Sequence, residues 1–305
     1  MTDTHSVRDA ALASLAGLRV IKGHGTGNDF VIVPDPEGSL DLTPDQVQAL
    51  CDRHRGVGGD GVLRVAPTVL SSEVADQGGS ATWFMDYRNA DGSLAEMCGN
   101  GARVFARYLR EAGLETADAF AIATRRGVTH IQMYDDGDVE INMGPATTPA
   151  LAELPIVRVR DRGWTGTPVF TSNPHCVVFV EDGLNDGENP SHVLATLDLS
   201  TKPVIEPAVV FPDSANVEFV IRISQRHLML RVHERGVGET MACGTGSCAT
   251  MWAAAQRDDA ADVVAYQVES PGGTVTVRRD SHHDLFLRGP AMLVATVVIG
   301  ATSAE

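Results

Sequence analysis

A repeat at an offset of 145 residues is the feature that most constrains how this 305-residue chain can fold. The segment MCGNGA at residues 97–102 recurs as ACGTGS at residues 242–247. Three further landmarks share the offset: Asn28 with Asn173, Gly127 with Gly272, and Gly144-Pro145-Ala146 with Gly289-Pro290-Ala291. One offset shared by several separated landmarks indicates a duplicated domain.

Each half also shows the same order of secondary-structure signals. An Asn-bearing turn leads into a short apolar strand, and a later strand runs into a loop that ends at the CGxG element. Helices rich in alanine and aliphatic residues are predicted over residues 99–112 and 244–257, as for a helix surrounded by sheet. Short strands close each half, which is an α+β pattern. We therefore predict two pseudo-symmetric domains, residues 1–143 and 144–289, with a final strand in residues 290–305 that returns to the first domain.

The CGxG elements place a thiol at the start of each predicted helix. The first backbone N–H groups of a helix have no partner within it and carry partial positive charge, and glycines let a ligand approach them closely. Such a site can bind a carboxylate. The same field should lower the pKa of Cys98 and of Cys243, so that part of each thiol is thiolate near neutral pH.

Two such sites at duplicated positions indicate a reaction that needs one thiol on each side of a carbon atom. If the halves face one another across a pseudo-twofold axis, one thiolate can remove an α-proton while the opposite thiol protonates the other face. This inverts a stereocentre. A helix terminus contributes only about 0.3–1 kcal/mol, whereas enzymes remove roughly 8 kcal/mol or more from a barrier. The remainder requires preorganised donors in a dry site, so we expect the halves to close over the substrate.

The composition argues against several other classes of function. A net charge of −16 without a Lys/Arg-rich run disfavours a nucleic-acid partner. No apolar run is long enough to span a membrane, and the N-terminus does not resemble a secretory signal, so we expect a cytoplasmic protein. The two lysines, Lys22 and Lys202, lie in contexts that do not suit a pyridoxal Schiff base. Five cysteines without a CxxC pair predict free thiols and not a usual zinc site, with Cys51, Cys176 and Cys248 buried.

Six segments, taken together, closely resemble the diaminopimelate epimerase family. They are GHGTGNDFVIV (23–33), RNADGSLAEMCGNGARVFARY (88–108), NPHCVVFV (173–180), NVEFV (216–220), HERGVGETMACGTGSCAT (233–250) and SPGGTVTV (270–277). The resemblance implies two domains, each a curled, mostly antiparallel sheet around a central helix, with the site between them. It also implies a homodimer that interconverts LL- and meso-diaminopimelate, for lysine and peptidoglycan synthesis, without pyridoxal phosphate or metal.

The resemblance assigns roles residue by residue. Cys98 and Cys243 match the acid/base pair. The groups that match the holders of the reacting carboxylate are Gly99, Asn100, Gly244 and Thr245, and those that match the substrate pocket are Asn28, Asn89, Asn173, Asn216 and Arg235. Arg235 suits bidentate binding of the distal carboxylate. Glu234 and His175 match residues beside the reacting centre, where they could bind the amino group or tune the thiols. Gly61 stands where some members carry Gln and offers no side chain there.

Three alternatives stay open at this point. A proline- or hydroxyproline-type racemase of the same fold would use the same twin thiols, although Arg235 and several Asn residues favour a substrate with a second zwitterionic end. A thiol redox-switch protein would instead pair Cys98 with Cys243 and would exchange no α-proton. A phosphate-binding module built on the glycine-rich helix starts would not need paired cysteines.

Overall fold

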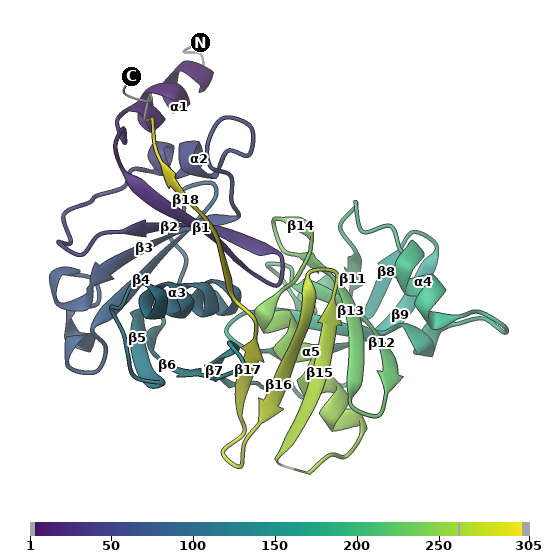
Figure 1. Cartoon of the computed structure of the whole chain (residues 1–305). Coiled ribbons are helices and arrows are strands. Elements are labelled where there is room, and N and C mark those ends of the chain that lie inside the picture. Colours follow the sequence, from purple (N-terminus) through teal and green to yellow (C-terminus); the bar gives the residue numbers. More distant parts are fainter. Residues whose placement is uncertain (1–3, 262, 301–305) are drawn as a thin grey trace. The chain divides into compact units, whose positions relative to one another are not determined.

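The computed structural model describes residues 4–261 and 263–300, which form two compact units (Figure 1). Unit 1 consists of the described residues up to Ile141 and those from Pro290 onward, and unit 2 is Asn142–Gly289. The predicted boundary between residues 143 and 144 lies inside strand β7 (Val139–Pro145). Of the segments assigned to the first domain, residues 1–3 and 301–305 lie outside the described residues.

Unit 1 is a mostly antiparallel sheet around helix α3 (Gly99–Glu111). Its strands, in order of pairing, are β18 (Met292–Val298), β1 (Arg19–Gly25), β2 (Asn28–Pro34), β3 (Gly61–Pro67), β4 (Trp83–Asn89), β5 (Ala119–Thr124), β6 (Gly127–Met133) and β7. In this series β2–β3 and β4–β5 are parallel pairs. The remaining helical segments are α1 (Thr4–Ala13), α2 (Pro44–Cys51), η1 (Thr68–Leu70) and η2 (Ala75–Gly79). Figure 1 shows α3 inside the curve of this sheet, where it contacts β1, β2, β3, β4 and β18.

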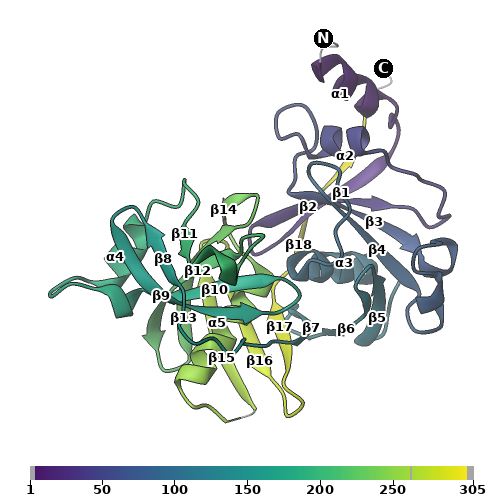
Figure 2. The same ribbon diagram turned by 180° about the vertical axis from the view of Figure 1, so that it is seen from behind.

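Unit 2 repeats this architecture around helix α5 (Gly244–Arg257). Its main strands, in order of pairing, are β8 (Ile156–Val159), β9 (Arg162–Phe170), β10 (Pro174–Phe179), β12 (Asn216–Ser224), β13 (His227–Glu234), β15 (Val264–Ser270), β16 (Gly273–Arg279) and β17 (Asp284–Gly289). The short strands β11 (Val204–Glu206) and β14 (Gly238–Thr240) pair with β8 and β13. The other helical segments are η3 (Val180–Gly183), α4 (Pro190–Thr196) and η4 (Ala208–Val210). Figure 2 shows α5 with the strands of unit 2 around it.

The pairing pattern is the same in the two units. Along β1-β2-β3-β4-β5-β6-β7 the pairs run antiparallel, parallel, antiparallel, parallel, antiparallel, antiparallel. Along β9-β10-β12-β13-β15-β16-β17 the pairs repeat that sequence of directions. This confirms the predicted α+β duplication, with a mostly antiparallel sheet around a central helix in each unit.

Most residues of both central helices are buried. Ala102, Val104, Phe105 and Leu109 of α3 have no exposed surface. Removing a side chain of this kind, as in Phe105→Ala, costs about 3–5 kcal/mol. Helix α3 ends before Gly113, whose φ of +70° suits a glycine at a helix C-terminus. In the described part of the chain, no helix is both long and apolar enough to cross a bilayer.

Candidate active site

Both cysteines of the CGxG elements are the N-cap residues of the central helices. Cys98 has an extended backbone, and its Sγ accepts a hydrogen bond from the Gly101 N–H at 3.4 Å. Cys243 repeats this geometry, with the Gly246 N–H 3.4 Å from its Sγ. An N-cap side chain normally satisfies one unpaired N–H of the first turn through an oxygen. Here sulfur takes that place, so each thiol lies at the positive end of its helix.

Asn28 is the first residue of β2 and lies against the start of α3. Its Oδ1 accepts from the Cys98 thiol at 3.7 Å and from Asn100 Nδ2 at 3.3 Å. Its Nδ2 donates to Asp60 Oδ2 at 2.7 Å, and the same oxygen accepts the Asp29 N–H at 3.1 Å. Asp60 therefore fixes the amide of Asn28 with its oxygen towards the thiol.

A cluster of charged side chains holds Asp60 in position. Arg53 bonds both oxygens of Asp29 and donates to Asp60 Oδ1 at 2.7 Å. Burial acts to raise the pKa of Asp29, but hydrogen bonds from Arg53 and Lys22 outweigh it and hold this pKa well below its usual range. The Lys22 ammonium also donates to the Gly58 carbonyl, so one of the two lysines belongs to this cluster.

Asn89 ends β4 and pairs in register with Gly61 at the start of β3. Its side-chain amide donates to Ser93 Oγ at 3.0 Å, and its backbone N–H donates to the Ser93 carbonyl. Asn89 thereby closes the turn that leads to Cys98. Position 61 offers only backbone, as the sequence indicated, and a Cβ there would lie 2.6 Å from the Arg88 carbonyl oxygen.

Cys243 lies among groups that oppose its ionisation. The residue is only 6% exposed, and burial raises the pKa of its thiol well above the ordinary value. The carboxylates of Glu234 and Glu218 raise it further, whereas the Thr245 hydroxyl, 3.4 Å from Sγ, and the Gly246 N–H lower it by less. The expectation that the helix field lowers this pKa is therefore wrong for Cys243, because desolvation and two carboxylates exceed the effect of one helix terminus.

Glu234 ends β13, and its carboxyl group lies close enough to the Cys243 thiol for each group to shift the pKa of the other. Burial raises the pKa of Glu234, and a hydrogen bond from Thr240 Oγ1, at 2.5 Å, and the Cys243 thiol lower it. Two of the predicted site residues thus lie close together in unit 2.

The other predicted residues of unit 2 form two further groups. His175 is fully buried on β10, with Nε2 2.8 Å from Asn173 Oδ1 and Nδ1 2.7 Å from Glu218 Oε1. Asn216, at the start of β12, accepts the backbone N–H of Arg235 at 2.8 Å. The side chain of Arg235 is exposed and makes one long bond, to the Asp213 carbonyl at 3.4 Å. Its guanidinium therefore retains donors for a ligand.

Sequence reasoning missed Asp60 and Glu218. Asp60 lies in GVGGDGV, where it passes for an ordinary turn residue, and nothing in the sequence links it to Asn28, 32 positions away. Glu218 left a signal, since it is an acidic residue in the otherwise apolar strand NVEFV. A carboxylate at a buried strand position must find a partner, and that partner, His175, becomes visible only when β10 and β12 are paired.

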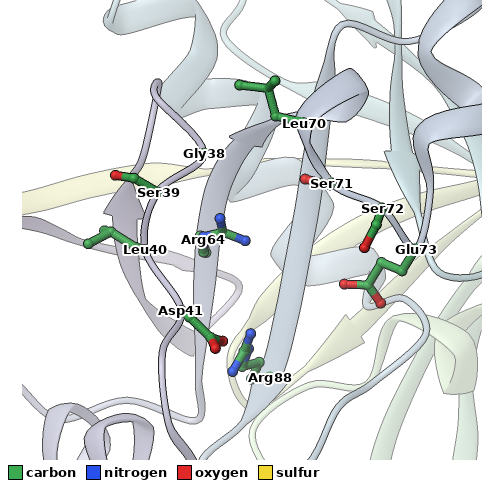
Figure 3. A pocket seen from close by; sticks show the side chains of 10 residues that line it. All are labelled: Gly38, Ser39, Leu40, Asp41, Arg64, Leu70, Ser71, Ser72, Glu73 and Arg88. Carbon is green, nitrogen blue, oxygen red and sulfur yellow. The ribbon is translucent and has the colours of Figure 1, made fainter.

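A separate hollow in unit 1, with a volume of about 330 Å³, has none of the predicted site residues in its lining (Figure 3). Arg64 and Arg88 line it, but their guanidinium groups are already bonded to Asp35 and Asp86. Asp86 has no exposed surface and also binds Arg125, so this region is a buried ion network. Its arginines offer little to an anionic ligand.

Comparison with known proteins points to one family. The family model described as diaminopimelate epimerase matches residues 20–149 and 168–294. A protein named diaminopimelate epimerase from Streptomyces coelicolor is 48% identical over 280 residues, which cover 90% of this chain and 93% of that protein. One of the same name from Thermobifida fusca is 45% identical over 282 residues, covering 91% of this chain and 96% of that protein.

Solved structures share the fold at low identity. A PhzF-family phenazine biosynthesis protein from Bacillus anthracis has a TM-score of 0.60 at 20% identity, covering 92% of this chain and 98% of that one. A hydroxyproline epimerase from Agrobacterium vitis has a TM-score of 0.59 at 14% identity, covering 92% of this chain and 91% of that one. Both are similar to this chain in fold.

Proposed function

The chain belongs to the diaminopimelate epimerase family, and from this premise we propose that it interconverts LL- and meso-2,6-diaminopimelate with Cys98 and Cys243 as its acid/base pair. The reaction supplies a precursor of lysine and peptidoglycan. The observation that carries the assignment of the thiols is their repeated geometry: each caps a buried helix and accepts an N–H at 3.4 Å.

The chemistry needs only proton transfers. One cysteine, as thiolate, takes the α-proton, and the other, as thiol, gives its proton to the opposite face of the same carbon. Each turnover leaves one thiol and one thiolate with their roles exchanged, so the proton balance closes. The carboxylate of the reacting carbon lies at the helix starts, where unpaired N–H groups stabilise the negative charge that develops on it. The groups proposed to hold it are Gly99, Asn100, Gly244 and Thr245.

The remaining residues bind and orient the substrate in this proposal. The side-chain amides that bind the substrate are those of Asn28, Asn89, Asn173 and Asn216. Arg235 binds the distal carboxylate through its exposed guanidinium. Glu234 and His175 act next to the reacting centre, Glu234 through its charge beside Cys243.

The proposal also includes the assembly and the compartment. We place the protein in the cytoplasm, where five cysteines outside any disulfide are compatible with a reducing environment. We expect a homodimer, and exposed apolar residues on β18, Met292, Val294 and Val298, support self-association. Sedimentation equilibrium tests this, and Val294→Lys should weaken the association if β18 takes part.

Incubation with LL-diaminopimelate in deuterated water tests the reaction. Mass spectrometry should find one α-deuterium in the meso product. Cys98→Ser and Cys243→Ser should each reduce turnover by at least about a thousandfold, since each removes a proton carrier that has no substitute. Cys248→Ala, a buried cysteine on the same helix as Cys243, is the matched control and should retain turnover.

Fully reduced protein that exchanges no α-proton of diaminopimelate would overturn the proposed function. Racemisation of proline or hydroxyproline under the same conditions would favour the alternative within this fold. A protein with neither activity, but with a reversible disulfide between the two cysteines, would support the redox-switch alternative.

A further inference from the structure

The two units differ in charge at matching positions around their thiols. Phe30 pairs in register with Gly61 in unit 1, as His175 pairs with Asn216 in unit 2. Counting along these strands, His175 takes the place of Phe30, and Glu218 takes the place of Leu63. Glu234 takes the place of Asn89, because these residues end the matching strands β13 and β4. Unit 1 is neutral at all three positions, whereas unit 2 carries two carboxyl groups and an imidazole.

The matching side chains lie under the first turn of the helix in each unit. A Cβ built on Gly101 would lie 3.2 Å from Leu63 Cδ2 and 3.5 Å from Phe30 Cζ. A Cβ built on Gly246 would lie 2.6 Å from Glu218 Oε1. The Glu218 carboxyl group therefore touches the backbone of α5 three residues after Cys243. The glycine at this position is what allows the approach.

The contacts of His175 fix the orientation of its ring. Nδ1 meets Glu218 Oε1 at 2.7 Å and Nε2 meets Asn173 Oδ1 at 2.8 Å. Thr171 Oγ1 donates to the same Asn173 oxygen at 3.2 Å, which supports the orientation of that amide. Because oxygen atoms face both ring nitrogens, a doubly protonated ring would satisfy both contacts, with Glu218 as its counter-charge.

This pair is costly, and the fold does not need it. Both side chains have no exposed surface, and Glu218 Oε2 has no hydrogen-bond partner in the part of the chain that the structure describes. Buried ion pairs often contribute nothing to stability relative to apolar residues of similar size. Unit 1 shows that Phe and Leu fill the same positions beneath an equivalent helix. A costly pair that an apolar pair could replace points to a role in the chemistry.

We propose that Glu218 is a positioning residue for the Cys243 half of the active site. Its buried carboxylate holds His175 as an imidazolium turned towards Asn173 and keeps a fixed negative charge beneath the start of α5. This charge favours the thiol form of Cys243 over the thiolate, in addition to the effect of Glu234. The inference rests on the proposed function for its kinetic consequence, but the state of His175 and of Cys243 can be measured without turnover.

Glu218→Gln is the discriminating variant, because it keeps the shape of the side chain and removes its charge. We expect kcat to fall about tenfold or more, the effect of losing one charge-assisted hydrogen bond, with KM changed less than about threefold. Glu218→Asp should recover part of the loss. In Glu218→Gln, the pH dependence of Cys243 alkylation by iodoacetamide, measured in a Cys98→Ser background, should shift to lower pH.

Nitrogen-15 NMR of labelled histidine supplies a readout that a packing defect would not mimic. In the wild-type protein both ring nitrogens of His175 should show shifts of protonated nitrogen, and in Glu218→Gln the ring should become a neutral tautomer. Glu269→Gln is the matched control, because Glu269 pairs with His227 at 3.1 Å in the same unit but at a partly exposed site. Glu269→Gln should leave kcat and the pH dependence of Cys243 alkylation unchanged.

The double variant His175→Phe/Glu218→Leu copies the pair of unit 1. We expect it to fold with a thermal midpoint at least equal to the wild type and to have lost most turnover; full activity would overturn the proposal. A neutral His175 ring in the wild type, or an unchanged Cys243 curve in Glu218→Gln, would overturn it even if the double variant did not fold. Absence of diaminopimelate turnover with the expected NMR and alkylation results would instead reject the proposed function alone.

Discussion

Asp60 controls the amide of Asn28, and we predict that Asp60→Ala lowers kcat/KM for diaminopimelate about tenfold. Oδ2 of Asp60 accepts Asn28 Nδ2 at 2.7 Å and the Asp29 N–H at 3.1 Å. A hydrogen bond to a charged group contributes roughly 1.5–3 kcal/mol. The Asp60 side chain is 43% exposed, so water replaces part of the lost interaction and the lower end applies. About 1.4 kcal/mol corresponds to a factor of ten in rate.

The loss should come from position rather than from folding. Without Asp60 the Asn28 amide is free to rotate, and its oxygen no longer faces the Cys98 thiol at 3.7 Å. Rates of α-deuterium incorporation in Asp60→Ala and Asp60→Asn measure the effect. Asp60→Asn should lose less, because its side-chain oxygen can still accept from Asn28.

A double-mutant cycle decides whether Asp60 acts through Asn28. In an Asn28→Ala background, Asp60→Ala should add little further loss. The matched control is Asp9→Ala, whose partner Arg55 lies at 3.4 Å with both side chains largely exposed, and which should leave kcat/KM unchanged. Equal losses from Asp60→Ala in the presence and absence of Asn28 would refute the reasoning, as would a wild-type rate in the single variant.

Three further perturbations test other parts of the structure. Glu234→Gln should lower the pKa of Cys243, because it removes the largest contribution after burial; the pH dependence of alkylation in a Cys98→Ser background measures this, and an unmoved curve would contradict it. Gly246→Ala should reduce turnover at least about tenfold, because its Cβ meets a buried carboxylate oxygen at 2.6 Å and must displace it; a wild-type rate would show that the contact has no consequence. Asp86→Asn should cost about 3–5 kcal/mol of unfolding free energy at pH 7, since it removes the buried carboxylate that Arg64, Arg88 and Arg125 share. The pKa of Asp86 is lowered in the folded protein, so its carboxylate stabilises the fold above about pH 4 and this stabilisation is lost as the pH falls further. Urea unfolding should therefore show that the difference in unfolding free energy between variant and wild type narrows below about pH 4.

The repeat was enough to predict the architecture. An offset of 145 residues places Cys98 on Cys243 and Asn28 on Asn173, and the central helices and most of the strands keep that spacing. The order of short strands and one Ala-rich helix in each half then limits the topology. The match between β3 and β12 was not predictable from the offset. Ten extra residues precede β12, so that Gly61 matches Asn216 and not the residue 145 positions after it.

The candidate site was predictable where it depends on local geometry. A cysteine before Gly-x-Gly caps a helix in both units, and this follows from the glycines and the helix that comes after them. The pKa of Cys243 did not follow, because it depends on Glu234 and Glu218, which neighbouring strands bring to the thiol. Contacts between residues far apart in the chain, such as Asp60 with Asn28, require the folded sheet.

The difference between the two thiols arises in the strands and leaves the helix starts alike. An enzyme that inverts a carbon in both directions needs one thiolate and one thiol at the same moment. Two thiols in identical surroundings would favour the same protonation state, so that either the thiolate or the thiol that the reaction needs would be missing. Cys243 lies next to carboxylates, whereas the matching positions in the other unit are Leu63 and Asn89, so the surroundings of the two thiols differ. Both helix starts nevertheless keep the N–H groups that can bind a carboxylate. Under the proposed function, duplication therefore supplies the two like helix starts that bind the carboxylate, and the strands supply the asymmetry that proton transfer requires.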